Sequence, residues 1–251
     1  MNPTHLFILT GASRGMGLAM AQQLLQAGHH LLCISRQTNE ALAAQARAAG
    51  LRLEQWSQDL AHSAQAAARL QQWLAQIQVR PASATLINNA GVIPAIAPLS
   101  ALAADDVAGA LRVDLEAPMV LTAAFLAATE SWGVPRKVLN ISSGLGRRPM
   151  ASQAVYCAAK AGMDHYTRCL ALEEARKPAG ARVCALAPGV IDTDMQLQLR
   201  GADAASFPDR ARFEQLKQGG QLDSPEVAAR KVLAYLHSPG FGSEPVADVR
   251  G

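Results

Sequence analysis

The stretch LFILTGASRGMG, residues 6–17, places an apolar run directly before a glycine-rich turn and a helical pattern. Gly11, Gly15 and Gly17 follow a G-x-x-x-G-x-G spacing. Glycine lets a backbone turn sharply and approach a pyrophosphate, and the N-terminus of the next helix offers free N–H groups with a positive partial charge. The stretch therefore predicts a strand, a dinucleotide-binding loop and a helix.

The rest of the chain repeats this alternation of apolar runs and helical patterns. Because continuous apolar strands alternate with helices, the pattern predicts a parallel sheet covered on both faces. LRLEQW at 51–56 lies between two of the expected helices. We expect strands at 6–10, 30–35, 84–91, 137–143 and 181–189, and helices at 15–27, 39–49, 62–78, 103–130, 153–176 and 224–237.

Composition narrows the class of protein. The chain has 251 residues, is 50% hydrophobic and 17% charged, which suits one large α/β domain. A net charge of +3 without a basic block, and only 4% aromatic residues, argue against nucleic acid as a partner. No run approaches the roughly 20 apolar residues of a membrane span, and the N-terminus does not resemble a signal peptide. With 4 cysteines in no CxxC pair, we expect a cytoplasmic protein without a metal site.

Two arginines bear on the choice of cofactor. A carboxylate after the second strand would receive the 2′-hydroxyl of NAD. Here Arg36 stands at that point, and Arg14 lies inside the glycine loop. Two guanidinium groups can hold a 2′-phosphate through charge-assisted hydrogen bonds, so the sequence favours NADP(H). The alternative is that Arg36 is a solvated loop residue.

Residues 155–160 read VYCAAK, so Tyr156 and Lys160 lie one turn apart on one helix face. Free tyrosine has a pKa near ~10, too high for efficient proton transfer at neutral pH. An ammonium within about 4–6 Å can lower it by roughly 1–3 units. The spacing is also typical of a surface helix with a solvated lysine. The motifs around the pair must therefore decide whether it is a catalytic pair or an ordinary surface pair.

Four separated segments together are similar to the short-chain dehydrogenase/reductase family: TGASRGMG at 10–17, NNAG at 88–91, the serine pair and YxxxK within 142–160, and PGVIDT at 188–193. The resemblance covers essentially the whole chain. It implies one domain over 1–251 with a Rossmann fold, whose doubly wound, seven-stranded parallel sheet carries helices on both faces. It also implies a homodimer or homotetramer built on the two long helices.

The resemblance divides the domain and assigns its catalytic residues. A dinucleotide-binding half would cover about 1–135, and a catalytic and substrate-binding half about 136–251. Tyr156 would protonate a substrate carbonyl, with its pKa lowered by Lys160 and by NADP+. Lys160 would also hold the nicotinamide ribose, and Ser143 would hydrogen-bond the carbonyl. Family members often carry an asparagine in the long middle helix where this chain has Asp114, so Asp114 is a further catalytic candidate whose charge could alter the proton relay.

The resemblance also implies which residues hold the cofactor. They lie in the glycine loop, after the second strand, beside the adenine, after the fourth strand, on the catalytic helix and around the carboxamide. They are Gly11, Ser13, Arg14, Gly15, Met16 and Gly17; Arg36; Asp59 and Leu60; Asn88, Asn89, Ala90 and Gly91; Tyr156 and Lys160; and Pro188, Gly189, Val190 and Thr193.

The C-terminal third resembles the branch of sepiapterin reductases and bacterial benzil reductases, through PGVIDTDMQ and the ending SEPVADVRG. In the pterin reductases an aspartate near the end anchors the substrate, which implies this role for Asp248. An aspartate there is also typical of a cap or an ion pair. Residues 190–222 fit neither period, so we expect an irregular substrate loop whose apolar residues, Met195 among them, close a pocket.

These observations favour one function and leave two alternatives. The leading hypothesis is an NADPH-dependent carbonyl reductase that acts on a ketone or vicinal diketone, because an apolar pocket suits such substrates. A β-ketoacyl-type ketoreductase would need a basic patch for a phosphopantetheine arm, and Arg147 and Arg148 are the candidates. A non-catalytic NADP(H)-binding regulator would typically have lost Tyr156 or Lys160, and both are present.

Overall fold

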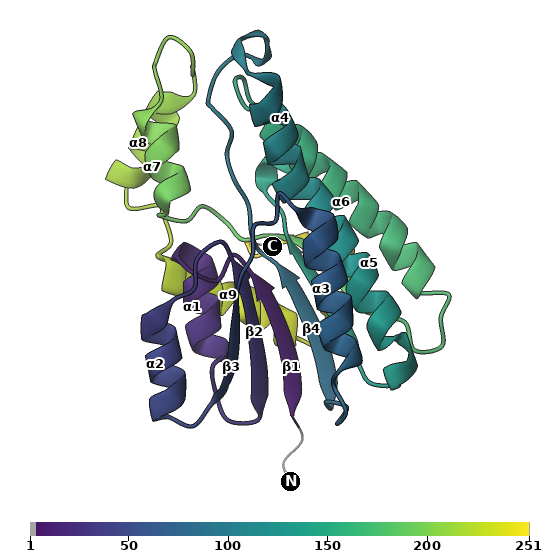
Figure 1. Ribbon diagram of the computed structural model, residues 1–251. Coiled ribbons are helices and arrows are strands. Elements are labelled where there is room, and N and C mark those ends of the chain that lie inside the picture. Colours follow the sequence, from purple (N-terminus) through teal and green to yellow (C-terminus); the bar gives the residue numbers. More distant parts are fainter. Residues whose placement is uncertain (1–3, 251) are drawn as a thin grey trace.

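A computed structural model describes residues 4–250, and a single parallel sheet forms its centre (Figure 1). The spatial order of the strands is β3-β2-β1-β4-β5-β6-β7, and every neighbouring pair is parallel. This confirms the α/β Rossmann fold with a doubly wound, seven-stranded parallel sheet. The strands are β1 His5–Thr10, β2 His29–Ser35, β3 Arg52–Ser57, β4 Ser83–Asn88, β5 Arg136–Ile141, β6 Arg182–Ala187 and β7 Val246–Asp248.

Helices cover both faces of the sheet because successive side chains of each strand point to opposite sides. In β1, Phe7 and Leu9 pack into one core with α1, α2 and α9, whereas Leu6 and Ile8 pack into a second core with α3 and α5. The helices are α1 Gly15–Leu24, α2 Glu40–Ala48, α3 Ser63–Ala75, α4 Ala104–Leu111, α5 Ala117–Thr129, α6 Ala154–Glu174, α7 Asp194–Gly201, α8 Arg210–Gln218 and α9 Pro225–His237.

The expected helix over 103–130 is interrupted in the middle. A π-helical turn, η2 Arg112–Glu116, separates α4 from α5, and the N–H of Ala117 donates to the carbonyl of Arg112. Pro118 explains the break, because proline has no N–H to donate to the carbonyl four residues earlier. That carbonyl belongs to Asp114, which therefore sits on an irregular turn rather than on a regular helix.

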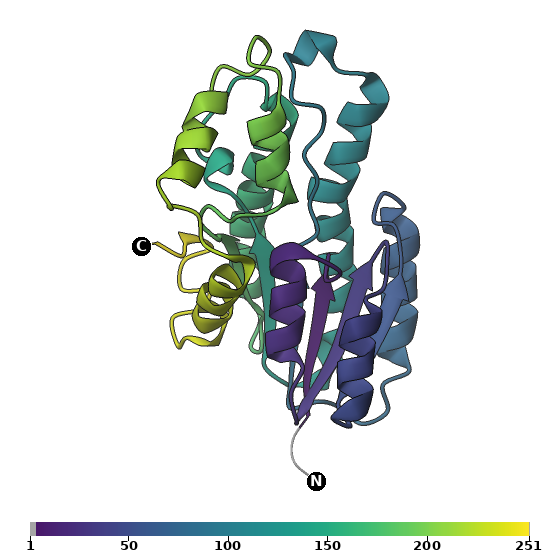
Figure 2. The ribbon, with the colours of Figure 1, turned by 90° about the vertical axis from the view of Figure 1, so that its left-hand side faces the viewer.

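The expectation of an irregular segment over 190–222 is wrong. The segment contains α7 and α8, which stand beyond the carboxyl ends of the strands, on the opposite side of Figure 1 from α4 (Figures 1 and 2). Leu199, Phe207 and Phe213 bury their side chains in a small core of their own. Two short helices with so few apolar positions produce only a weak periodic signal in the sequence.

Within residues 4–250, no helix combines the length and the apolar character that crossing a membrane requires. The same residues contain no group of three or more His, Cys, Asp or Glu side chains placed to hold a metal ion.

Candidate active site

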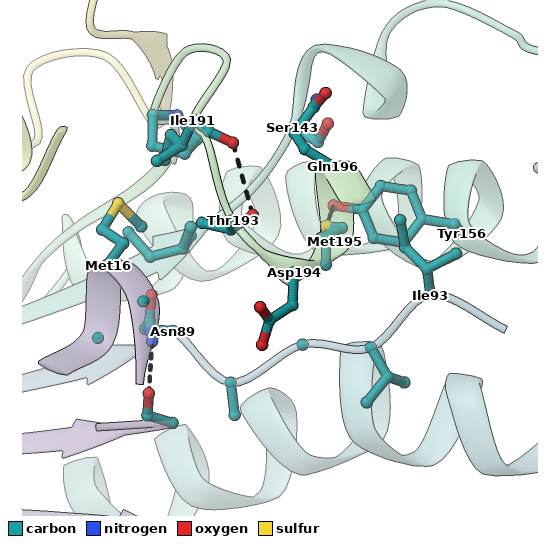
Figure 3. A pocket seen from close by; sticks show the side chains of 18 of the residues that line it. Met16, Asn89, Ile93, Ser143, Tyr156, Ile191, Thr193, Asp194, Met195 and Gln196 are labelled. Carbon is teal, nitrogen blue, oxygen red and sulfur yellow. Dashed lines mark hydrogen bonds between the residues drawn. The ribbon is translucent and has the colours of Figure 1, made fainter. Parts of the chain in front are cut away.

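A cavity of about 1150 Å³ opens at the carboxyl edge of the sheet. The glycine loop, the turns after β4, β5 and β6, and the helices α7 and α8 line it (Figure 3). Since the chain passes from β1 to β2 on one side and the sheet continues through β4 on the other, the cavity lies at the topological switch point. Open α/β sheets bind their ligands at such points.

The glycine loop is shaped for close approach. Gly11 and Gly15 have φ values of +68° and +53°, which favour glycine. A Cβ on Gly17 would lie 2.0 Å from the carbonyl oxygen of Gly11, so only glycine fits where α1 leaves the loop. No side chain caps the N-terminus of α1. Its free N–H groups face a glycine-walled cavity, an arrangement that fits a pyrophosphate.

Asn89 holds this loop in place from the neighbouring strand. Its side-chain amide donates to the carbonyls of Thr10 at 3.0 Å and Gly11 at 3.2 Å. Asn88 behaves differently from the expectation that it lines the adenosine site. It is buried, its amide donates to Thr122 and Asn140, and it is not among the residues that line the cavity. Asn88 is the last residue of β4 and Asn89 follows it directly, so the two side chains point to opposite sides of the extended backbone.

The adenosine end contains both candidate arginines. Arg36, Asp59 and Leu60 line the cavity there. Arg14 also lines it, but its guanidinium forms an ion pair with Asp194 at the start of α7, at 2.8 Å. Both partners are largely exposed, so the pair is weak and Arg14 can exchange Asp194 for another anion.

Tyr156 and Lys160 lie on α6 and face into the cavity together. Both side chains are buried, and the Lys160 ammonium lies 5.6 Å from the centre of the Tyr156 ring. Lys160 donates to the carbonyl of Ile141 at the end of β5, at 3.1 Å. Ser143 follows two residues later and lines the same cavity. The tyrosine hydroxyl contacts the sulfur of Met195 on α7 at 3.9 Å, as Figure 3 shows.

Asp114 is fully buried beside this pair. Its Oδ1 accepts the N–H of Val92 at 2.8 Å, whereas its Oδ2 has no hydrogen-bond partner. Burial raises the pKa of Asp114, and the charge of Lys160 acts in the opposite direction. Burial lowers the pKa of Lys160, and Asp114 partly reverses that effect. The two groups therefore support each other's charged forms.

The electrostatics around Tyr156 differ from the expectation that a nearby ammonium lowers its pKa. Burial raises the pKa of Tyr156 above its ordinary value, the Asp114 charge raises it further, and a hydrogen bond with Ser143 lowers it. The main physical reason is burial, which disfavours the charged tyrosinate, and the negative charge of Asp114 adds to that effect. Asp114 thus places a buried acidic group beside the pair, and its role in a proton relay stays a prediction.

Most of the remaining expected residues line the cavity, and one does not. The carboxamide-side residues Pro188, Gly189, Val190 and Thr193 line it, as do Ser13, Met16, Ala90 and Gly91. Asp248 lies on β7 and borders a second, shallower cavity with Arg147 instead. Its carboxylate pairs with Arg250 at 2.6 Å, the ion-pair alternative left open by the sequence.

Two polar residues that line the cavity were not predicted from the sequence. Gln196 and Arg200 line the cavity from α7. No motif marks either of them, and their segment was expected to be irregular. Arg148 lines the main cavity too, whereas Arg147 pairs with the buried carboxylate of Asp164 at 3.0 Å.

Comparison with known proteins places this geometry in a family. Residues 5–204 match the family described as short chain dehydrogenase. Benzil reductase ((S)-benzoin forming) of Bacillus cereus is 35% identical over 235 residues, which cover 93% of this chain and 94% of that protein. Sepiapterin reductase of Xenopus tropicalis is 34% identical over 251 residues, which cover 95% of this chain and 93% of that protein. The crystal structure of a metagenomic short-chain oxidoreductase in complex with NADP superposes with a TM-score of 0.73 at 26% identity. The superposition covers 99% of this chain and 96% of that protein.

The sheet order, the glycine loop and the paired tyrosine and lysine define a Rossmann-fold oxidoreductase that acts on CH–OH and C=O groups. The chain belongs to the short-chain dehydrogenase/reductase family. Within that family, its sequence resembles the branch of benzil reductases and sepiapterin reductases.

Proposed function

We propose that the protein is an NADPH-dependent carbonyl reductase that converts a ketone or vicinal diketone to the alcohol. The observation that carries the proposal is the buried Tyr156–Lys160 pair, which faces the same cavity as Ser143 and the glycine loop. The relatives named benzil reductase and sepiapterin reductase support a carbonyl substrate.

The cofactor would lie along the switch-point crevice. The glycine loop and the N-terminus of α1 would hold the pyrophosphate, Arg14 and Arg36 a 2′-phosphate, and Lys160 the nicotinamide ribose. When bound, NADPH supplies the hydride for the carbonyl carbon. The complex of a relative with NADP is consistent with this choice.

The chain's own residues then handle the proton and exclude water. Ser143 positions the carbonyl oxygen by a hydrogen bond, and Tyr156 gives its hydroxyl proton to that oxygen as the C=O bond becomes C–OH. Tyr156 is protonated at neutral pH, as an acid for reduction must be, and the positive nicotinamide that forms as the hydride leaves would counteract its raised pKa. Lys160 stabilises the tyrosinate that remains after transfer. Met195 and Ile93 cover the site with apolar surface (Figure 3).

The test is steady-state oxidation of NADPH, and of NADH in parallel, with benzil, 1-phenyl-1,2-propanedione, sepiapterin and an acetoacetyl thioester. Tyr156→Phe should abolish turnover. Tyr166→Phe is the matched control, because Tyr166 lies on the same helix outside the cavity lining. Turnover that survives Tyr156→Phe would refute the assigned acid, and equal rates with NADH would refute the role of Arg14 and Arg36. Preference for the thioester would instead favour a β-ketoacyl-type enzyme.

We also propose that copies of the chain assemble through α5 and α6. Met119 on α5 and Leu172 on α6 are 44% and 72% exposed, although both are large and apolar. Exposed alanines continue the apolar surface along both helices. Light scattering should give a dimer or tetramer, and Leu172→Glu should shift it towards monomer; a monomeric wild-type protein would refute the assembly.

A further inference from the structure

The part of the cavity between α7 and α8 is basic. The carboxylate of Asp192 accepts hydrogen bonds from the Lys217 ammonium, at 2.5 Å, and from the Arg200 guanidinium, at 3.4 Å. One negative charge is therefore shared between two positive charges. The other nearby acid, Asp194, is already paired with Arg14. The lining residues of α7, α8 and the turn before α7 include three cations, Arg200, Arg212 and Lys217, against two acids, Asp192 and Asp194, so positive charge exceeds negative charge there.

Arg200 is the cation whose hydrogen bonding is least complete. A guanidinium has five N–H donors. Within residues 4–250, the Arg200 side chain donates to a single acceptor, the carboxylate of Asp192, over a long distance of 3.4 Å. Its Nη1 is buried and has no partner. Only 14% of the side chain is exposed, so bulk water does not replace the missing acceptors. Leaving such a donor without an acceptor costs free energy, which an anionic ligand would recover.

Gln196 adds a second unsatisfied group on the same face of α7, one turn earlier. Its amide oxygen is buried without a partner. Rotating the amide by half a turn would point its N–H groups where the oxygen now lies. Gln196 and Arg200 can thus present donors side by side.

These donors line the same cavity as Tyr156. Met195, at the start of α7, contacts the Tyr156 hydroxyl. Arg200 follows five residues later, about 7 Å along the helix axis. Arg200 lies about 140° around the helix axis from Met195. Its side chain reaches back along α7 to Asp192, which precedes the helix, and lines the same cavity as Tyr156. A group held by Arg200 would therefore be separated from the carbonyl by a spacer comparable to a para-substituted ring.

From this geometry we infer that the preferred substrate carries a carboxylate at the far side of such a spacer and that Arg200 binds it. The inference rests on the proposed carbonyl reductase function and specifies its substrate class. The carboxylate would approach Arg200 with Gln196 as a second donor, while Lys217 continues to neutralise Asp192.

The experiment compares 1-phenyl-1,2-propanedione with its 4-carboxy derivative, two diketones that differ only in the anionic group. The wild-type protein should show a KM about tenfold lower for the carboxylated diketone, as expected for one charge-assisted hydrogen bond. Arg200→Gln should raise the ratio of the carboxylated to the neutral KM by about tenfold, and Arg200→Lys should restore part of the preference because it keeps the charge.

Arg210→Gln is the matched control for these variants. It removes the same charge from the neighbouring helix, where Arg210 pairs with Glu214 and does not line the cavity. Its ratio of KM values should equal that of the wild-type protein. A ratio that moves as much in Arg210→Gln as in Arg200→Gln would overturn the assignment to Arg200.

The outcomes separate this inference from the proposed function. Reduction of the neutral diketone without preference for the carboxylate overturns the inference and leaves the reductase intact. If neither diketone is reduced, calorimetric titration of the carboxylated diketone in the presence of NADP+, which cannot reduce it, measures binding alone. Binding tighter to the wild-type protein than to Arg200→Gln supports the inference, and equal or absent binding overturns it.

Discussion

Replacing Asp114 by asparagine would remove one buried negative charge from beside Lys160 and Tyr156 while preserving the shape of the side chain. The amide oxygen can still accept the N–H of Val92. Asp114 raises the pKa of both Lys160 and Tyr156, so both pKa values should fall in the variant. Reduction requires a protonated tyrosine and a charged lysine. Activity should therefore be lost at a lower pH than in the wild-type protein.

The size of the effect follows from the distances. A Cβ built on Gly91 would lie 3.4 Å from Asp114 Oδ1 and 3.7 Å from Lys160 Nζ, which places those two atoms at most about 7 Å apart. Two unit charges at that distance interact by about 2.4 kcal/mol at an effective dielectric constant of ~20. The alkaline limb of the pH profile should move towards neutrality by between one and two pH units.

The assay is kcat/KM for a neutral diketone at saturating NADPH, measured between about pH 6 and 10. Asp106→Asn is the matched control, because it makes the same change of charge at an exposed position on α4. Its profile should coincide with that of the wild-type protein. An alkaline limb that stays in place or moves upwards in Asp114→Asn would refute the electrostatic reasoning.

Three further substitutions test the fold that holds the site. Glu174→Ala leaves the buried Arg136 guanidinium without its carboxylate and should lower the free energy of unfolding, measured in urea, by about 3–5 kcal/mol. The control Glu173→Ala changes an exposed neighbour and should have little effect. Equal losses in the two variants would contradict a stabilising buried pair. Gly17→Ala should abolish NADPH binding in a fluorescence titration, because its Cβ would lie 2.0 Å from a backbone oxygen, and unchanged affinity would contradict the packing of the loop. Ser224→Ala removes the N-cap of α9 and should lower the melting temperature by an amount equivalent to about 1 kcal/mol; no change would mean that the cap contributes nothing.

The sequence predicted the parts of the site that depend on local chemistry. Gly11, Gly15 and Gly17 mark a loop that few other residues could form, and the spacing of Tyr156 and Lys160 places them on one face of any helix. Continuous apolar strands were enough to predict a parallel sheet. These features depend on residues that are close together in the chain.

Features that depend on distant partners could not be predicted. The ion pair between Arg14 and Asp194 joins residues 180 positions apart, and nothing near either residue indicates it. Asn88 turns into the core because Thr122 and Asn140 receive its amide there. The helices α7 and α8 are stabilised mainly by a small core assembled in three dimensions, so their own sequence carries little periodicity.

The π-helical turn before α5 fixes the rotational phase between two helices. Each residue of a regular α-helix turns the chain by about 100°. Deleting one residue from 112–116 would rotate α5 by more than a quarter turn relative to α4. Leu121 and Phe125, both fully buried, would then leave the core beneath the sheet. The number of residues in this stretch is therefore constrained separately from their identity, and homologues should tolerate substitutions here more readily than insertions or deletions.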